Sequence, residues 1–161
     1  MPLSLFRHCG PLRGRLVPGY WTCDDHPMRL RLELFVSNMQ SSIAFYTETL
    51  GFRVARADPD YVSVRNGSVV LGLGPVAKLP EAGVGPGFTQ QRLHADRGAG
   101  VEIVLELDDL NGLAALYRRC QTRGVVVQPL REQPWGLQDF RLVDPDGYYL
   151  RMTHGDAAAA E

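Results

Sequence analysis

The chain has 161 residues, 45% of them hydrophobic and 22% charged, and its 17 basic and 18 acidic residues give a formal net charge of −1. This length and composition are typical of one globular domain, or of two small modules that share a core. The balanced charge, without a basic cluster, argues against nucleic-acid binding, because phosphate contacts need a surplus of lysine and arginine on one face. The sequence contains no run of about 18 apolar residues and so predicts no membrane-spanning helix.

The three cysteines, Cys9, Cys23 and Cys120, are widely spaced and odd in number. They fit neither a disulfide framework nor a paired-cysteine zinc site, so we expect a protein of the reducing cytoplasm. Cys120 falls in a predicted helix, where an inert, partly buried thiol is the expected state.

Residues 1–27 differ from the rest of the chain, because four prolines interrupt them and no helical or alternating pattern is sustained. Arginines stand where a secretory signal would need an apolar core. The cysteines and histidines of this segment have a spacing that matches no common zinc finger. We expect a loose extension, or a start assigned too far upstream, since Met28 stands immediately before the first predicted strand.

The first half of the remaining chain predicts a strand, a helix and three further strands. Residues 28–36 alternate as a strand does, with Leu30, Leu32, Leu34 and Val36 on one face and Arg31, Glu33 and Phe35 on the other. A helix over 39–50 follows, with Asn38 as its N-cap and Gly51 as its stop. Three short strands are predicted over 52–58, 61–65 and 68–73, and the Asn66-Gly67 pair between the last two favours a tight hairpin.

The second half repeats this order. Residues 101–107 predict a strand with Val101, Ile103, Leu105 and Leu107 on one face and Glu102, Val104 and Glu106 on the other. Asp109 is the expected N-cap of a helix that ends before Gly124, with an apolar stripe of Leu110, Leu113 or Ala114, and Tyr117. Strands are predicted over 125–131, 139–143 and 148–152, the last two joined by the turn residues 144–147.

The two halves are related by a fixed offset. Val36, Asn38, Met39 and Tyr46 recur 71 residues later as Leu107, Asp109, Leu110 and Tyr117. Both halves therefore predict a βαβββ module, over residues 28–74 and 100–155, within one domain of residues 28–155. Residues 75–99, rich in proline and glycine, are expected to form a connector or flap without regular elements, and residues 156–161 a disordered tail.

These motifs carry a family resemblance over residues 28–154. The segments SIAFYTETLGF, DDLNGLAALYRRCQTRGV and PWGLQDFRLVDPDGYYLRM resemble the vicinal oxygen chelate superfamily. That superfamily includes glyoxalase I, extradiol dioxygenases, and fosfomycin- and bleomycin-resistance proteins, and the bleomycin-resistance proteins are the most similar in pattern. The resemblance implies an α+β fold in which two tandem βαβββ modules form a concave mixed sheet.

The resemblance also identifies where catalytic members would hold a metal ion. Their histidine, glutamine or glutamate ligands correspond here to Arg31, Glu102, Arg151, and Leu71 or Gly72. Arginine is permanently cationic and has no free lone pair, so of these residues only Glu102 could bind a divalent ion. One carboxylate does not make a stable transition-metal site, and we expect no metal and no other cofactor.

The concave side of the predicted sheet instead combines charges and aromatic rings. Its expected residues are Arg31, Glu33, Phe35, Glu102, Val104, Glu106, Tyr149 and Arg151. Buried ions need partners, so these groups either pair with one another or line a wet pocket for a polar ligand. The first interpretation predicts ion pairs of Arg31 with Glu102, and of Arg151 with Glu33 or Glu106.

Trp135 lies between Pro134 and Gly136 in a loop, and two interpretations are open for it. By resemblance to bleomycin-resistance proteins, it would form a stacking platform for planar drug rings together with Tyr149 and Phe35. Alternatively, its indole closes the open end of the core.

The function that we expect is binding and sequestration of a small antibiotic-like molecule, planar or cationic, by a cytoplasmic homodimer without nucleic-acid or membrane partners. Ligand-binding residues would be Arg31, Glu33, Phe35, Glu102, Glu106, Trp135, Tyr149 and Arg151. The alternative is an enzyme of secondary metabolism, a lyase, isomerase, epimerase or dioxygenase-like protein. In that case Glu102 would be the general base, beside Arg31 or Arg151 as an anion clamp.

Overall fold

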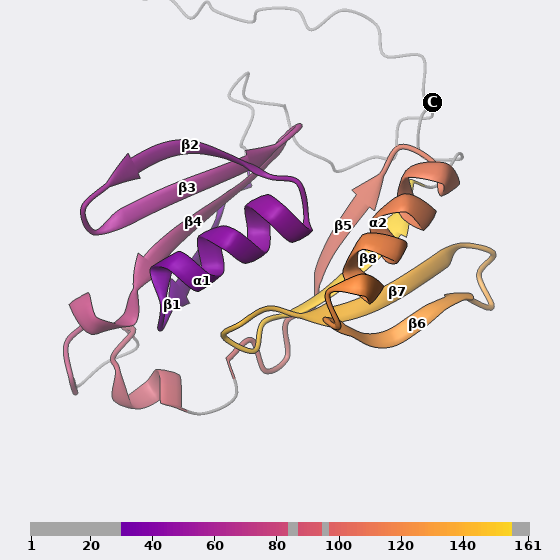
Figure 1. Cartoon of the computed structure of the whole chain (residues 1–161). Coiled ribbons are helices and arrows are strands. Elements are labelled where there is room, and N and C mark those ends of the chain that lie inside the picture. The colour runs from indigo at the N-terminus through magenta and orange to yellow at the C-terminus, as the bar shows by residue number, and fades with distance from the viewer. Residues whose placement is uncertain (1–29, 84–86, 95–96, 156–161) are drawn as a thin grey trace, which may run out of the picture.

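The computed structural model describes residues 30–83, 87–94 and 97–155 (Figure 1), so the predictions for residues 1–27 and 156–161 lie outside it. The strands are β1 (Leu32–Val36), β2 (Arg53–Asp58), β3 (Tyr61–Asn66), β4 (Val69–Pro75), β5 (Ile103–Leu107), β6 (Val126–Glu132), β7 (Gln138–Val143) and β8 (Tyr149–His154). The helices are α1 (Met39–Ala44), which continues as a π-helical turn over Phe45–Thr49, and α2 (Leu110–Thr122). The connector also contains two short 3-10 helices, Val76–Lys78 and Gln91–His94, where the sequence predicted no element.

The predicted pair of βαβββ modules is confirmed. The first module is a four-stranded sheet in the order β1-β4-β3-β2, and the second is a four-stranded sheet in the order β5-β8-β7-β6. In each sheet the first strand pairs in parallel with the fourth, and the other pairings are antiparallel. Each helix lies across one face of its own sheet (Figure 1), and the fold is therefore the α+β arrangement that the repeat predicts.

Local sequence signals define both helices. The side chain of Asn38 accepts a hydrogen bond from the backbone N–H of Ser41 at 3.0 Å. The side chain of Asp109 accepts one from Gly112 at 2.7 Å. These bonds satisfy amide groups that the first turn of a helix leaves unpaired. After the helices, Gly51 (φ +76°) and Gly124 (φ +67°) adopt the left-handed conformation that suits glycine, so the predicted caps and stops are confirmed.

The core of each module lies between its helix and its sheet. The first core contains Leu34, Val36, Phe45, Tyr46, Leu50, Phe52, Val62, Val64, Leu71 and Leu73, and the second contains Ile103, Leu113, Leu116, Cys120, Phe140, Leu142, Leu150 and Met152. The predicted apolar stripe of α2 is confirmed at Leu113, which is buried, and at Tyr117, which packs against the core, but it was wrong at Leu110, which is 46% exposed. Leu116 and Cys120 are buried in addition. Burial raises the pKa of the Cys120 thiol to about 11, so it stays protonated at neutral pH.

The expected burial of two strand residues was wrong. Leu30 is 82% exposed and Val101 is 57% exposed, although the alternation assigned both to the core face. β1 begins pairing with β4 only at Leu32, and β5 begins pairing with β8 only at Ile103. Leu30 and Val101 precede these paired segments, so alternation alone does not bury them.

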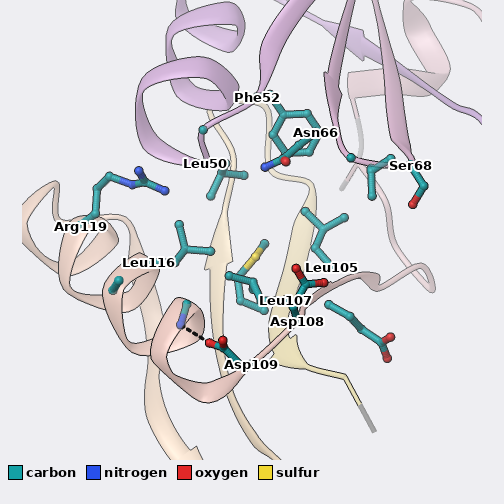
Figure 2. A pocket seen from close by; sticks show the side chains of 17 residues that line it. Leu50, Phe52, Asn66, Ser68, Leu105, Leu107, Asp108, Asp109, Leu116 and Arg119 are labelled. Atoms are coloured by element: carbon teal, nitrogen blue, oxygen red, sulfur yellow. Dashed lines mark hydrogen bonds between the residues drawn. The ribbon is translucent and has the colours of Figure 1, made fainter. Parts of the chain in front are cut away.

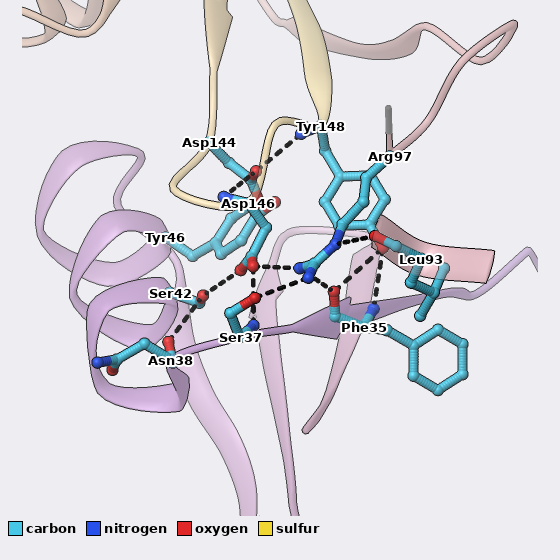
Figure 3. A network of polar contacts seen from close by, with 10 residues as sticks. All are labelled: Phe35, Ser37, Asn38, Ser42, Tyr46, Leu93, Arg97, Asp144, Asp146 and Tyr148. Carbon is cyan, nitrogen blue, oxygen red and sulfur yellow. Dashed lines mark hydrogen bonds and ion pairs between the residues drawn. The ribbon is translucent and has the colours of Figure 1, made fainter. Parts of the chain in front are cut away.

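Polar contacts connect the second module to the first at a site that we call junction A, where the turn between β7 and β8 meets the start of α1 (Figure 3). Asp146 accepts a hydrogen bond from the backbone N–H of Ser37 at 2.7 Å and one from the hydroxyl of Ser42 at 3.1 Å. Arg97 forms an ion pair with Asp146, whose side chain is 3% exposed. Arg97 also donates to the hydroxyl of Ser37 at 2.7 Å.

Two tyrosines complete junction A. The Tyr46 hydroxyl donates to Asp144 Oδ2 at 2.9 Å, inside the interface. The Tyr148 hydroxyl lies 3.1 Å from the backbone nitrogen and 3.2 Å from the backbone oxygen of Phe35, at the end of β1. Burial is the largest cause that raises the pKa of Tyr46, and it also raises the pKa of Asp144. Junction A therefore holds the two modules together through buried, mutually satisfied polar groups.

Candidate functional site

The helix-free face of each sheet, which we call its open face, carries most of the predicted site residues. In β8, Leu150 and Met152 are buried in the core, while the alternate residues Tyr149 and Arg151 are only half-buried. The registers place Glu33 beside Gly72 in the first module, and Val104 beside Arg151 in the second. Strand alternation therefore separates apolar core residues from a polar and aromatic open face.

On the open face of the second module four charged side chains form a cluster, which we call the module 2 cluster: Glu102, Asp139, Arg141 and Arg151. Arg141 Nε lies 3.3 Å from Glu102 Oε1, and Arg151 Nε lies 3.3 Å from Glu102 Oε2. Arg141 Nη1 also lies 2.7 Å from Asp139 Oδ1. Both oxygens of Glu102 thus face guanidinium groups contributed by two neighbouring strands.

Asp139 is the deepest member of the module 2 cluster and is fully buried. Its Oδ1 atom accepts hydrogen bonds from Arg141 and from Gln133 Nε2, each at 2.7 Å. Its Oδ2 atom has no hydrogen-bond partner among the described residues, and Arg151 Nη1 lies 3.8 Å away. A buried carboxylate oxygen without a donor is unfavourable, so this atom would gain from a hydrogen-bond donor that reaches it.

The open face of the first module carries a smaller cluster around Glu33. Arg31 Nε lies 2.7 Å from Glu33 Oε1, and the Tyr61 hydroxyl donates to the same oxygen at 3.2 Å. A Cβ atom on Gly72 would lie 1.9 Å from Glu33 Oε2, so the carboxylate occupies space that any other residue at position 72 would fill. Glycine at this position therefore lets Glu33 lie flat across β4.

The predicted ion pairs were wrong. Arg31 pairs with Glu33, two residues along the chain, instead of with Glu102, and Arg151 pairs with Glu102 instead of with Glu33 or Glu106. Glu33 lies in the other sheet from Arg151, and the register places Glu106 beside Thr153 instead of beside Arg151. Glu106 is exposed and forms no ion pair within the described residues.

The aromatic residues of the site lie in separate places. Phe35 packs against Phe88 of the connector, with ring centroids 4.8 Å apart. Tyr149 lines a shallow depression with Glu102 and residues 97–101. Trp135 lies in the loop between β6 and β7 and is 56% exposed, so the interpretation that it closes the core was wrong.

The metal-site positions do not suit a transition metal. Leu71 is fully buried in the core, and Gly72 contributes no side-chain donor. Glu102 is the one carboxylate at the four positions, and both its oxygens face guanidinium groups. Within residues 30–83, 87–94 and 97–155, no three histidine, cysteine, aspartate or glutamate side chains lie close enough to hold a metal ion. A donor set of one carboxylate and two arginines does not fit such an ion.

Sequence reasoning missed three members of this site: Asp139, Arg141 and Gln133. A signal for two of them was present, because Asp139 and Arg141 alternate with the core residues Phe140 and Leu142 in β7. Applying the face assignment used for the first and fifth strands to this strand would have found both. Gln133 lies outside regular structure and has no such pattern.

The same fold and repeat occur in known proteins. The family model described as the Glyoxalase/Bleomycin resistance protein/Dioxygenase superfamily matches residues 25–152. The chain belongs to this superfamily. A search of curated proteins finds no match. No helix of the described residues is both long and apolar enough to cross a membrane.

Solved structures of this superfamily resemble the chain over most of its length. A bleomycin resistance determinant encoded on the transposon Tn5 has 25% sequence identity and a TM-score of 0.58, and the match covers 81% of this chain and 99% of that chain. A bleomycin-binding protein complexed with bleomycin has 25% identity and a TM-score of 0.55, with coverage of 81% and 100%. The lactoylglutathione lyase from Agrobacterium tumefaciens, at 17% identity, a TM-score of 0.64 and coverage of 82% and 96%, shares the fold.

Proposed function

We propose that this superfamily member binds and sequesters a small antibiotic-like molecule in the cytoplasm, without a metal ion or other cofactor. The observation that carries the proposal is the module 2 cluster, in which Arg141 and Arg151 each lie 3.3 Å from Glu102 where catalytic relatives would hold a metal. The two bleomycin-related structures, each 25% identical to this chain, support the choice of ligand class.

The open faces supply the chemistry that such binding needs. Exposed aromatic surface at Trp135 stacks on planar rings, and carboxylates accept hydrogen bonds from amines and amides of the ligand. Asp139 Oδ2 and the unpaired Glu106 are acceptors that the described residues leave free. The proposed ligand-binding residues are Arg31, Glu33, Phe35, Glu102, Glu106, Trp135, Tyr149 and Arg151, and we add Asp139 to them because its Oδ2 atom has no hydrogen-bond partner among the described residues. Affinity alone would remove free drug by mass action.

The proposal includes a homodimer whose grooves form between chains. Both β1 and β5 pair on one side only within the described residues, so each sheet ends in an edge strand. Val104 on the open face of β5 is 38% exposed. An edge strand beside exposed apolar residues favours association with a second copy. Sedimentation velocity should give the mass of a dimer, and a monomer at tens of micromolar would contradict this part of the proposal.

Titration with metal-free bleomycin tests the binding function. Isothermal calorimetry should show saturable binding, and mass spectrometry should recover the drug unchanged. The substitution Trp21→Phe removes the indole outside the described residues, and bleomycin should then quench the remaining Trp135 fluorescence. Quenching should disappear in the Trp21→Phe/Trp135→Phe protein.

The role of Glu102 separates binding from catalysis. Glu102→Gln should weaken bleomycin binding about tenfold or more, because a hydrogen bond between a ligand and a charged group typically contributes about 1.5–3 kcal/mol and about 1.4 kcal/mol is a factor of ten in affinity. Glu48→Gln, an exposed glutamate paired with Arg123 on the helix side, is the matched control and should bind normally. The contrary result would be that the native protein converts the ligand chemically, and that Glu102→Gln still binds the ligand but no longer converts it. This result would contradict sequestration and favour an enzyme.

A further inference from the structure

The internal repeat creates a second place where the modules face each other, equivalent in sequence to junction A. There, the turn between β3 and β4 and the start of α2 line one cavity, and we call this site junction B (Figure 2). The two sites correspond because the helix N-caps Asn38 and Asp109 are 71 residues apart. At junction A the hairpin turn of one module contacts the first helical turn of the other, and at junction B the equivalent elements line a cavity.

Junction B is open, whereas junction A is filled. Residues 144–148 separate β7 from β8, and their side chains bond directly to α1. Only Gly67 and Ser68 separate β3 from β4. The shorter turn leaves a cavity of about 640 Å³ between itself and α2.

Part of the cavity wall is apolar. Leu50 and Phe52 come from the first module, and Leu105, Leu116 and Met152 come from the second (Figure 2). These residues belong to the hydrophobic core or pack against it, and of the proposed open-face residues only Glu106 also lines the cavity. Its volume lies in the range of roughly 300–1,000 Å³ that small-molecule sites occupy.

Negative charge gathers at one end of the cavity. Glu106, Asp108 and Asp109 line it around the start of α2, and Asp109 caps the helix through Gly112 at 2.7 Å. None of these three carboxylates forms an ion pair in the part of the chain that the structure describes. Arg119 lines the cavity ten residues after Asp109, which places it roughly 15 Å along the helix axis, too far to neutralise the acidic end.

Junction A shows what chemistry the acidic end lacks. At junction A, the carboxylate that lies against the start of α1 belongs to Asp146, in the turn between β7 and β8. The Arg97 side chain, which is 11% exposed, neutralises its charge. At junction B the carboxylates belong to the residues that begin α2, and no described cation lies against them. Unpaired carboxylates at the end of a cavity with apolar side chains in its wall favour a cationic partner, because opposite charges attract and an apolar body gains from burial.

We propose that the cavity at junction B binds a small organic cation with an apolar body. An ammonium or guanidinium group of the ligand takes at Asp108 the place that Arg97 takes at Asp146, and the apolar body fills the space between Phe52 and Leu116. This site shares Glu106 with the proposed open-face site but is otherwise formed by different residues, so it does not rest on the proposed function.

Three probes with one apolar body and different charges test the site: 4-phenylbutylamine, 4-phenylbutanol and 4-phenylbutyrate. Isothermal calorimetry on the full chain at pH 7 should show one bound amine per chain. The amine should bind at least tenfold more tightly than the alcohol, and the carboxylate should bind most weakly. Equal affinity for the amine and the carboxylate, or no amine binding at millimolar concentration, would overturn the proposal.

The variant Asp108→Ser/Asp109→Asn gives junction B the dipeptide Ser37-Asn38 of junction A. It removes both charges but keeps a helix cap, because Asn38 caps α1 in the same way. Amine affinity should fall at least tenfold while alcohol affinity is unchanged. Glu81→Gln, which removes a charge from the exposed connector, is the control and should leave amine affinity unchanged.

Two further variants locate the bound amine. Ala115 lines the cavity, so Ala115→Phe should abolish binding of both the amine and the alcohol. Glu102→Gln on the open face should leave amine binding intact. If Glu102→Gln loses amine affinity, or if Asp108→Ser/Asp109→Asn keeps it, the amine binds elsewhere and the proposal is overturned. This conclusion holds whether or not the chain binds bleomycin.

Discussion

Junctions A and B derive from the same repeat and yet differ in how their polar groups are satisfied. At junction A, Asp146 and Arg97 form a nearly buried ion pair against the start of α1. At junction B, Asp108 and Asp109 stand at the start of α2 beside a cavity. Equivalent segments of a repeat thus form direct polar contacts at one junction and line a cavity at the other.

The two tyrosines of the repeat show the same difference. Tyr46 is fully buried and its hydroxyl donates to Asp144 across junction A. Its counterpart Tyr117 packs its ring edge-to-face on Phe140 within its own module, with centroids 5.2 Å apart. One residue type at one helical position thus supports either contact between modules or packing within a module.

The largest expected effect concerns the ion pair of junction A. Asp146→Ala leaves the Arg97 guanidinium without its buried partner, and breaking such a pair costs about 3–5 kcal/mol. Asp108→Ala at junction B removes an exposed carboxylate and should change the free energy of unfolding by within about 0.5 kcal/mol. Urea unfolding of both variants measures the contrast. Equal losses would show that the two junctions contribute alike to stability.

The next effect concerns the tyrosine pair. Tyr46→Phe removes a buried hydrogen bond and leaves Asp144 Oδ2 without that donor, which should lower the free energy of unfolding by about 1–3 kcal/mol. Tyr117→Phe keeps the ring packing and should cost less than about 0.5 kcal/mol. The same denaturant titrations test this difference, and a costlier Tyr117→Phe change would contradict the assignment of Tyr46 to junction A.

The smallest expected effect is a dependence on pH. Burial raises the pKa of the Asp144 carboxyl, so its ionisation costs more in the folded protein than in the unfolded chain. The stability that the protonated form contributes is fully present below the pKa of the unfolded residue, roughly 4, and is lost as pH rises through the raised folded-state pKa. The free energy of unfolding of the native chain, measured relative to Asp144→Asn, should therefore fall between pH 4 and pH 7. A rise over this interval would contradict burial as the dominant influence.

Local features of the fold could be predicted because each depends on neighbouring residues. The caps at Asn38 and Asp109, the stop at Gly51 and the order of elements follow from signals within one or two turns of chain. The ends of strands could not be predicted in this way. Leu30 continues the alternation of β1 but precedes its first pairing with β4, and pairing depends on a partner far along the sequence.

The candidate site was predicted in composition but not in its contacts. Alternation placed Arg31, Glu33, Glu102 and Arg151 on the open faces, and for Glu33 and Arg151 that face assignment agrees with the strand registers. Their partners depend on which strands are adjacent, and this adjacency put Arg141 and Asp139 beside Glu102 and Arg151. Sheet register therefore decided the ion pairs that the residue types alone left open.

The sequence by itself determined that the chain consists of two equivalent modules with near-balanced charge, because strand alternation, helix caps and hairpin turns are short-range signals repeated 71 residues apart. Only the tertiary structure decided how that charge is distributed between the junctions. Arg97 reaches Asp146 across 49 positions of sequence, and no described cation lies against Asp108. The physical reason is that ion pairing depends on distances in space. The turn at junction A is three residues longer than the turn at junction B, and Arg97 of the connector lies against it, so the two equivalent sites have different ion pairs.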